Sequence, residues 1–264
     1  MIIDTHAHYD DERFDEDRDE LLLSMKEKGV EAIVNASASL KGCYDSLALA
    51  LKYDFMYFLA GIHPSDALDL EVEGNFDEIK RMAMHERCVA VGEIGLDYYW
   101  DEPDRSIQKK WFESQLLIAL EVNKPIIIHS RNAASDTYEI LSEYTKKYNE
   151  KSKDLSPGVI HCYSYGSQMA LDYVNMGFYI GVGGVVTFKN SKKLKEVVEA
   201  VPIDRIVLET DSPYLSPEPF RGKRNNSANL KYIAQKLAEL KNMEYDEIIS
   251  VTRKNAMELY RLGK

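Results

Sequence analysis

Histidine is the first residue type in this chain that could support chemistry, because four of its six histidines, at positions 6, 8, 129 and 161, lie in or directly after short apolar runs. His6 and His8 are separated by one residue, and residues two apart on a strand project to the same side. Both imidazoles can therefore reach one metal ion, although such a pair can also sit at a strand edge and bind nothing. Asp4 shares that face, either as a carboxylate that orients a ligating histidine or as a structural carboxylate.

Two acidic residues are placed in the same way. Glu93 lies in the run Val-Gly-Glu-Ile-Gly, where a buried carboxylate is costly unless a positive group neutralises it, and its two oxygens can bridge two cations. A buried ion pair with arginine or lysine is the alternative, but no basic residue is adjacent in the run, and the flanking glycines leave space for close approach. Asp211 follows the run Ile-Val-Leu-Glu-Thr, and Glu209 is a weaker candidate on the same face.

His129 and His161 are each the first polar residue after an apolar run. A single histidine in that position is usually a hydrogen-bonded core residue, but two in successive runs favour a shared role. The six candidate metal ligands are His6, His8, Glu93, His129, His161 and Asp211. Imidazole and carboxylate ligands suit Zn, Mn, Fe, Co or Ni, whereas Mg prefers oxygen ligands, so the pattern leaves the metal open.

Eight apolar runs, each ending in polar residues, predict the strands that would position these side chains. They span residues 1–8, 30–37, 57–64, 89–98, 125–131, 158–164, 178–184 and 206–212. Stretches with helical spacing alternate with them, such as residues 106–121 and 133–148. This alternation predicts an α/β fold of the TIM-type (β/α)8 barrel class, with the site at the C-terminal ends of its strands. Strand eight would lie beside strand one, which places Asp211 near His6 and His8.

The composition is that of an ordinary globular protein, with 264 residues, 45% hydrophobic and 29% charged. We expect one domain over residues 1–264. The chain shows neither a signal peptide nor a run of about 20 apolar residues, and its three cysteines suit reduced thiols. These features predict a cytoplasmic protein without membrane contact. A loop rich in proline and charge spans residues 212–226, and helices are expected over residues 230–240 and 245–260.

The formal net charge of −11 argues against a surface that attracts polyanions everywhere. A nucleic-acid substrate would have to be held locally. Bound divalent cations would supply such a local positive field.

Short motifs run in order along nearly the whole chain. They cover residues 3–8, 61–64, 91–98, 108, 112, 115, 125–131, 161–164, 209–214 and 221–225. In these motifs the chain resembles the TatD family of metal-dependent deoxyribonucleases. One departure follows Arg224, where such relatives continue Asn-Glu-Pro but this chain reads Asn225-Asn226-Ser227, which leaves the contacts of that loop open.

The resemblance implies two divalent metal ions per subunit, drawn from Mg, Mn, Zn, Co or Ni. The first would be held by His6, His8, Glu93 and Asp211. The second would be held by Glu93, His129 and His161, so that Glu93 bridges the two. The resemblance also implies that His63 and Arg131 bind the scissile phosphate, with a capped turn and a surface ion pair as the plainer interpretations. Lys189 and the loop at residues 221–224 are further candidates for contacts to the phosphate backbone.

The implied activity is hydrolysis of nucleic-acid phosphodiester bonds by a water that two metal ions activate, with Asp211 and Glu93 as catalytic residues. DNA is the first choice of substrate and RNA the second, in a 3′–5′ exonuclease-like reaction. Amidohydrolase-type cleavage of a cyclic amide, lactone or small ester is the alternative, but Glu93 stands where those enzymes often use a modified lysine. A binding module without turnover is disfavoured because all six ligands are present. The native metal and the oligomeric state stay open.

Overall fold

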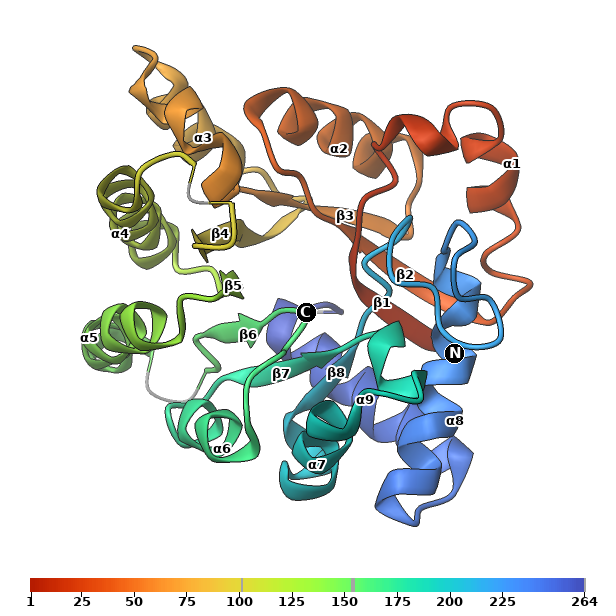
Figure 1. Ribbon diagram of the computed structural model, residues 1–264. Helices are drawn as coiled ribbons and strands as arrows, with labels where there is room; N and C mark the ends of the chain where they lie inside the picture. The colour runs from red at the N-terminus through yellow and green to blue at the C-terminus, as the bar shows by residue number, and fades with distance from the viewer. Residues whose placement is uncertain (101, 153–154, 264) are drawn as a thin grey trace.

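The computed structural model describes residues 1–100, 102–152 and 155–263, and its centre is one parallel eight-stranded sheet in the order β1 to β8 (Figure 1). The strands are β1 (Ile2–Ala7), β2 (Val30–Asn35), β3 (Met56–Ala60), β4 (Cys88–Asp97), β5 (Ile126–Arg131), β6 (Gly158–Ile160), β7 (Tyr179–Val182) and β8 (Ile206–Leu208).

Helices alternate with the strands and form the outer layer. The α-helices are α1 (Arg18–Leu23), α2 (Leu40–Lys52), α3 (Asn75–Ala83), α4 (Arg105–Val122), α5 (Ala134–Ser152), α6 (Ser167–Asn175), α7 (Lys192–Ala200), α8 (Leu230–Lys241) and α9 (Tyr245–Tyr260). Short 3-10 helices are η1 (Glu12–Phe14), η2 (Pro64–Glu71), η3 (Gly184–Thr187), η4 (Ile203–Arg205) and η5 (Ser227–Asn229). The architecture is the predicted TIM-type barrel, nearly closed. No helix in the described part of the chain combines the length and apolarity that crossing a membrane requires.

The seam between β8 and β1 is held differently from the other strand pairs. Among the described residues a single bridge joins Ala7 of β1 to Ser212, which lies beyond the end of β8. The Asp211 amide donates to the His6 carbonyl at 2.9 Å and the His8 amide to the Ser212 carbonyl at 2.7 Å. The Thr5 hydroxyl donates to the Leu208 carbonyl at 2.9 Å. A few backbone contacts and the Thr5 side chain therefore close the barrel where a regular strand ladder is absent.

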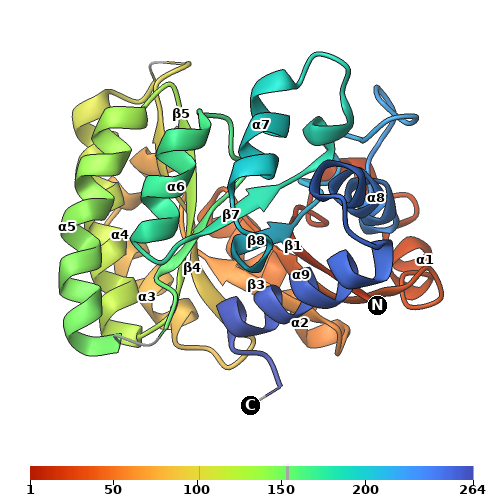
Figure 2. The ribbon, with the colours of Figure 1, turned by 90° about the horizontal axis from the view of Figure 1, so that it is seen from below.

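Apolar residues fill the barrel on both sides of the sheet, as parallel strands require. All ten residues of β4 are buried. One cluster, which includes Val34, Leu59, Ile127 and Val207, takes residues from several strands and packs with Leu259 near the end of α9. Helix α9 runs along β8 and β1 (Figure 2). A packed interior leaves the loops at the C-terminal ends of the strands as the place for a site.

Two predicted strands end earlier than expected, because their last residues leave the ladder. Strand β6 stops at Ile160 and β8 at Leu208, whereas apolar patterning extended them to residues 164 and 212. Cys162 and Asp211 have φ angles of 43° and 56°, a conformation that a strand ladder does not accommodate. The third strand also ends early, at Ala60, and His63 caps η2 instead.

Candidate active site

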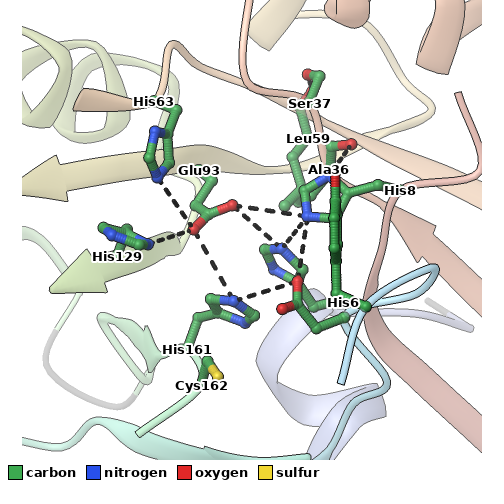
Figure 3. A network of polar contacts seen from close by, with 12 residues as sticks. His6, His8, Ala36, Ser37, Leu59, His63, Glu93, His129, His161 and Cys162 are labelled. Atoms are coloured by element: carbon green, nitrogen blue, oxygen red, sulfur yellow. Dashed lines mark hydrogen bonds and ion pairs between the residues drawn. The ribbon is translucent and has the colours of Figure 1, made fainter. Parts of the chain in front are cut away.

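The six predicted ligands come together at the C-terminal end of the barrel. Five of them, His8, Glu93, His129, His161 and Asp211, line a cavity of about 780 Å³, and His6 is fully buried beside it. Figure 3 shows imidazoles from β1, β5 and the segment after β6 grouped around the carboxylate of Glu93. His8 and Asp211, which are 203 positions apart in the sequence, thus share one pocket.

The two oxygens of Glu93 face two different groups of imidazoles. Its Oε2 lies 3.2 Å from His6 Nε2 and 3.9 Å from His8 Nε2. Its Oε1 lies 2.9 Å from His129 Nδ1 and 3.9 Å from His161 Nε2. The ion pair with arginine or lysine that was the alternative for Glu93 is therefore wrong. A carboxylate with histidine nitrogens at both oxygens has the arrangement that a bridging ligand needs.

The glycines beside Glu93 leave space for close approach, as expected, and the neighbour that approaches is β5. A Cβ on Gly95 would lie 1.9 Å from the His129 carbonyl oxygen, and one on Gly92 would lie 2.6 Å from Cβ of Ile127. The missing side chains let β5 approach β4 closely, which brings His129 to Glu93.

Asp211 lies between the two groups of imidazoles. Its Oδ1 is 3.3 Å from His8 Nε2 and 3.7 Å from His161 Nε2. Its backbone has a φ of 56°, so the turn after β8 directs this carboxylate back over the pocket. The side chain is 18% exposed, which leaves it accessible to a bound molecule.

The imidazoles are packed in the manner of ligands that converge on a cation. His6 Nε2 and His8 Nε2 are 3.1 Å apart, and both nitrogens face Glu93. The rings of His6 and His161 stack with centroids 3.5 Å apart. His8 Nδ1 lies 3.1 Å from the Ala36 carbonyl oxygen, a contact that directs the opposite nitrogen into the pocket.

The electrostatics show why this pocket favours a cation. Burial disfavours protonation of His8 and His161, but the nearby carboxylates of Asp211, Glu209 and Glu93 raise the pKa of His8 to about 9 and that of His161 to about 10. Burial likewise opposes the charge of Glu93, yet the charges of His6 and His161 hold its pKa well below the ordinary value. Bound metal would take the place of those protons, because histidine ligates in its neutral form.

Ligand atoms within 4.8 Å of one another form four groups in the described residues. These are His6, His8 and Glu93; His6, His161 and Asp211; His63, Asp97 and His129; and His161, Cys162 and Glu209. The donor set of imidazoles and carboxylates fits divalent transition-metal ions.

Two buried carboxylates orient the histidines of the second group. Glu209 Oε2 lies 3.0 Å from His161 Nδ1, and Asp97 Oδ2 lies 3.0 Å from His129 Nε2. A carboxylate on the far ring nitrogen fixes the orientation of a ligating imidazole. Glu209 was a candidate from the sequence and Asp97 was not, although the even spacing of Asp97 from Glu93 on one strand places both side chains on the same face.

Asp4 is the structural carboxylate of the two alternatives considered for it. It accepts hydrogen bonds from the hydroxyls of Thr210 and Ser227, each at 2.6 Å, and its contact with His6 is to the backbone amide at 3.3 Å. Asp4 therefore fastens the segments after β8 to β1.

Of the three predicted phosphate-binding residues, His63 and Arg131 line the cavity and Lys189 does not. His63 lines the pocket, with Nε2 3.9 Å from Glu93 Oε1, and also caps η2 by accepting from the Ser65 amide at 3.2 Å. Arg131 lines the pocket and holds its guanidinium 3.7 Å from the centre of the Tyr99 ring. Lys189 is exposed between η3 and α7, outside the described residues that line the cavity.

The loop at residues 221–227 is held by contacts within the chain. Arg224 pairs with Asp17, and the Arg221 guanidinium lies 4.3 Å from the centre of the Phe188 ring. Asn225 donates from Nδ2 to the carbonyls of Thr210 and Tyr214 at 2.9 and 2.8 Å. Asn225, which the TatD pattern shares, therefore supports the segment that carries Asp211, and Ser227, at a position that departs from the pattern, donates to Asp4 Oδ2 at 2.6 Å.

Replacing Glu209 with glutamine is expected to weaken metal binding by about 10- to 100-fold. The Cys162 amide donates to Glu209 Oε1 at 2.6 Å, so the single amide oxygen of glutamine would stay there and its NH2 group would face His161 Nδ1. That nitrogen would then have to accept, which puts the ring proton on Nε2, where the metal should bind. Competition of Co²⁺ against a chromophoric chelator measures the affinity, with Glu239→Gln at an exposed site as the control. Unchanged affinity in Glu209→Gln would refute the role.

Known proteins match this chain over nearly its whole length. A family model described as "TatD related DNase" matches residues 3–261. The chain is similar to the "Uncharacterized metal-dependent hydrolase YabD" of Bacillus subtilis, with 43% identity over 263 residues that cover 100% of both chains. The "Uncharacterized metal-dependent hydrolase YcfH" of Escherichia coli K12 is 35% identical, over 99% of this chain and 96% of the relative. The crystal structure of YJJV, a TatD homolog from Escherichia coli, superposes with a TM-score of 0.88 and 30% identity, covering 99% of this chain and 98% of that chain.

Proposed function

Because this chain belongs to the TatD family of metal-dependent hydrolases, we propose that it cleaves phosphodiester bonds of nucleic acids, with DNA as the first substrate to test. The observation that supports this proposal most is the position of Glu93, whose two oxygens face separate groups of imidazoles. Two cations side by side suit a displacement at phosphorus, where both the attacking and the leaving oxygen need stabilisation.

We assign the ligands as the resemblance to the TatD family implies. The first ion takes His6, His8, Glu93 and Asp211. The second takes Glu93, His129 and His161. When bound, two divalent cations would lower the pKa of a bound water molecule and offset negative charge on the phosphoryl oxygens.

Asp211 is the proposed general base. Although burial opposes its charge, its hydrogen bond with His8 and the charge of His161 hold the pKa of Asp211 below the ordinary value. The carboxylate is therefore ionised and can accept a proton from water. Its position between His8 and His161 places it against both halves of the site.

His63 and Arg131 are proposed to bind the phosphate. Burial and the charge of His129 lower the pKa of His63 to about 3, so it acts as a neutral hydrogen-bond donor. Arg131 supplies a permanent charge, and its stack on Tyr99 holds the guanidinium at the pocket. Arg131 thus gives the pocket a cationic group for a phosphate although the chain as a whole is acidic.

Replacing Arg131 with alanine is expected to raise KM by about 10- to 100-fold with little change in kcat, since a hydrogen bond to a charged group contributes about 1.5–3 kcal/mol. Steady-state kinetics on an oligonucleotide measure both constants. Arg81→Ala, at an exposed arginine on α3, is the control and should behave as wild type. A large fall in kcat with unchanged KM would contradict the binding role.

The activity itself is tested with a panel of substrates. Single- and double-stranded DNA and RNA, a dihydropyrimidine and a simple ester are each incubated with an added divalent ion and again with EDTA. We expect metal-dependent cleavage of nucleic acid. Cleavage of the cyclic amide and of none of the nucleic acids would establish the amidohydrolase alternative instead.

A further inference from the structure

Two patches of exposed apolar side chains lie at the mouth of the cavity. Trp100 is 66% exposed and Tyr99 53%, whereas Tyr214 is 40% exposed and Leu215 37%. Trp100, Tyr214 and Leu215 all line the cavity. Large apolar residues exposed singly are ordinary, but neighbouring pairs at one pocket indicate a ligand surface.

The two patches lie on opposite sides of the proposed metal centre. The first follows β4 and the second follows β8. In an eight-stranded barrel with the order β1 to β8, these strands are four positions apart, which is halfway around. A molecule bound at Glu93 therefore has one aromatic surface on each side.

Neighbouring groups hold the aromatic side chains in place. Tyr99 and Trp100 pack edge to face with ring centres 4.8 Å apart, and Arg131 covers Tyr99. On the other side the Tyr214 hydroxyl lies 2.9 Å from Asp11 Oδ2, and the Arg13 guanidinium lies 4.4 Å from the centre of the Tyr214 ring. Rings that are oriented in advance lose little freedom when a flat ligand stacks on them.

We propose that Trp100 and Tyr214 are stacking surfaces for the two nucleobases that flank the scissile phosphate. This inference rests on the proposed function and extends it to the substrate contacts. The matching ligand has a phosphate at the centre and a flat ring on each side, which is the chemistry of a dinucleotide unit. Stacking on aromatic side chains tolerates any base, because every base has a π-face.

Modified oligonucleotides test the proposal. Trp100→Ala and Tyr214→Ala should each raise KM by about tenfold on an ordinary oligonucleotide. An abasic spacer on one side of the scissile phosphate removes the base that one of the two rings would contact. On that substrate, the KM of the variant that lacks this ring should differ from the wild-type KM by less than about twofold. Tyr44→Ala, at a tyrosine of α2 that is 45% exposed, is the control. Unchanged KM, or equal increases on intact and abasic substrates, would overturn the proposal.

A binding measurement separates this inference from the proposed reaction. The chain has two tryptophans, so Trp111→Phe leaves Trp100 as the fluorescent reporter. In the metal-loaded protein, dAMP should quench Trp100 and 2-deoxyribose 5-phosphate should not. Quenching by dAMP in a protein that cleaves no nucleic acid would support the base site and refute the reaction. No quenching by dAMP, or equal quenching by both probes, would refute the base site even if DNA is cleaved.

Discussion

Replacing Glu93 with glutamine is expected to lower kcat by about a thousandfold or more and to remove bound metal. Glutamine keeps the shape of the side chain but offers one neutral oxygen in place of two charged ones. Glutamine therefore has no second charged oxygen for a cation, whereas the two oxygens of Glu93 face His6 on one side and His129 on the other. Stabilisation of the transition state by metal ions amounts to several kcal/mol, and about 1.4 kcal/mol corresponds to a tenfold change in rate.

The measurement combines elemental analysis of the purified protein with kcat on DNA. Circular dichroism shows whether the variant is folded, and Glu247→Gln, at an exposed position on α9, serves as the control. A Glu93→Gln protein that keeps its metal and its activity would refute the bridging role.

Replacing Asp211 with asparagine is expected to lower kcat by about 10²- to 10⁴-fold, the range for loss of a general base. Asparagine retains an oxygen that can ligate a cation but cannot take up a proton at neutral pH. The loss should therefore appear in kcat while most of the metal stays bound. Metal content and kcat measured on the same sample distinguish the two roles, and a loss of activity that only follows a loss of metal would make Asp211 a ligand and not a base.

The fold was predictable because its determinants are local. Each of the eight strands overlaps the range that apolar patterning indicated, with β3 and β4 starting one residue earlier, and α9 spans the residues expected for the last helix. The ends of β6 and β8 were not predictable, since Cys162 and Asp211 adopt positive φ angles that the alternation of apolar residues does not record.

The convergence of the six candidate ligands was predictable from the fold, because the strand ends of a barrel meet at one pole. Their assignment as metal ligands stays a proposal. The hydrogen-bond partners of the buried carboxylates could not be predicted from the sequence. Asp4 bonds to Thr210 and Ser227, which lie more than 200 positions away, and only a three-dimensional structure pairs such residues.

The aromatic surfaces at the mouth were not recognised from sequence either. Trp100 and Tyr214 lie inside or beside motifs that already suggested a site, but their exposure depends on how the loops after β4 and β8 are folded. Aromatic residues are common in any sequence, and it is their exposed position at the mouth of the cavity that indicates a contact with substrate.

The most direct test of the account is an anomalous difference map from crystals grown with Mn²⁺. We expect two peaks about 3.5 to 4 Å apart, one on each side of the Glu93 carboxylate. One should lie beside His6 and His8, and the other beside His129 and His161. A single peak, or peaks that do not contact Glu93, would contradict the account.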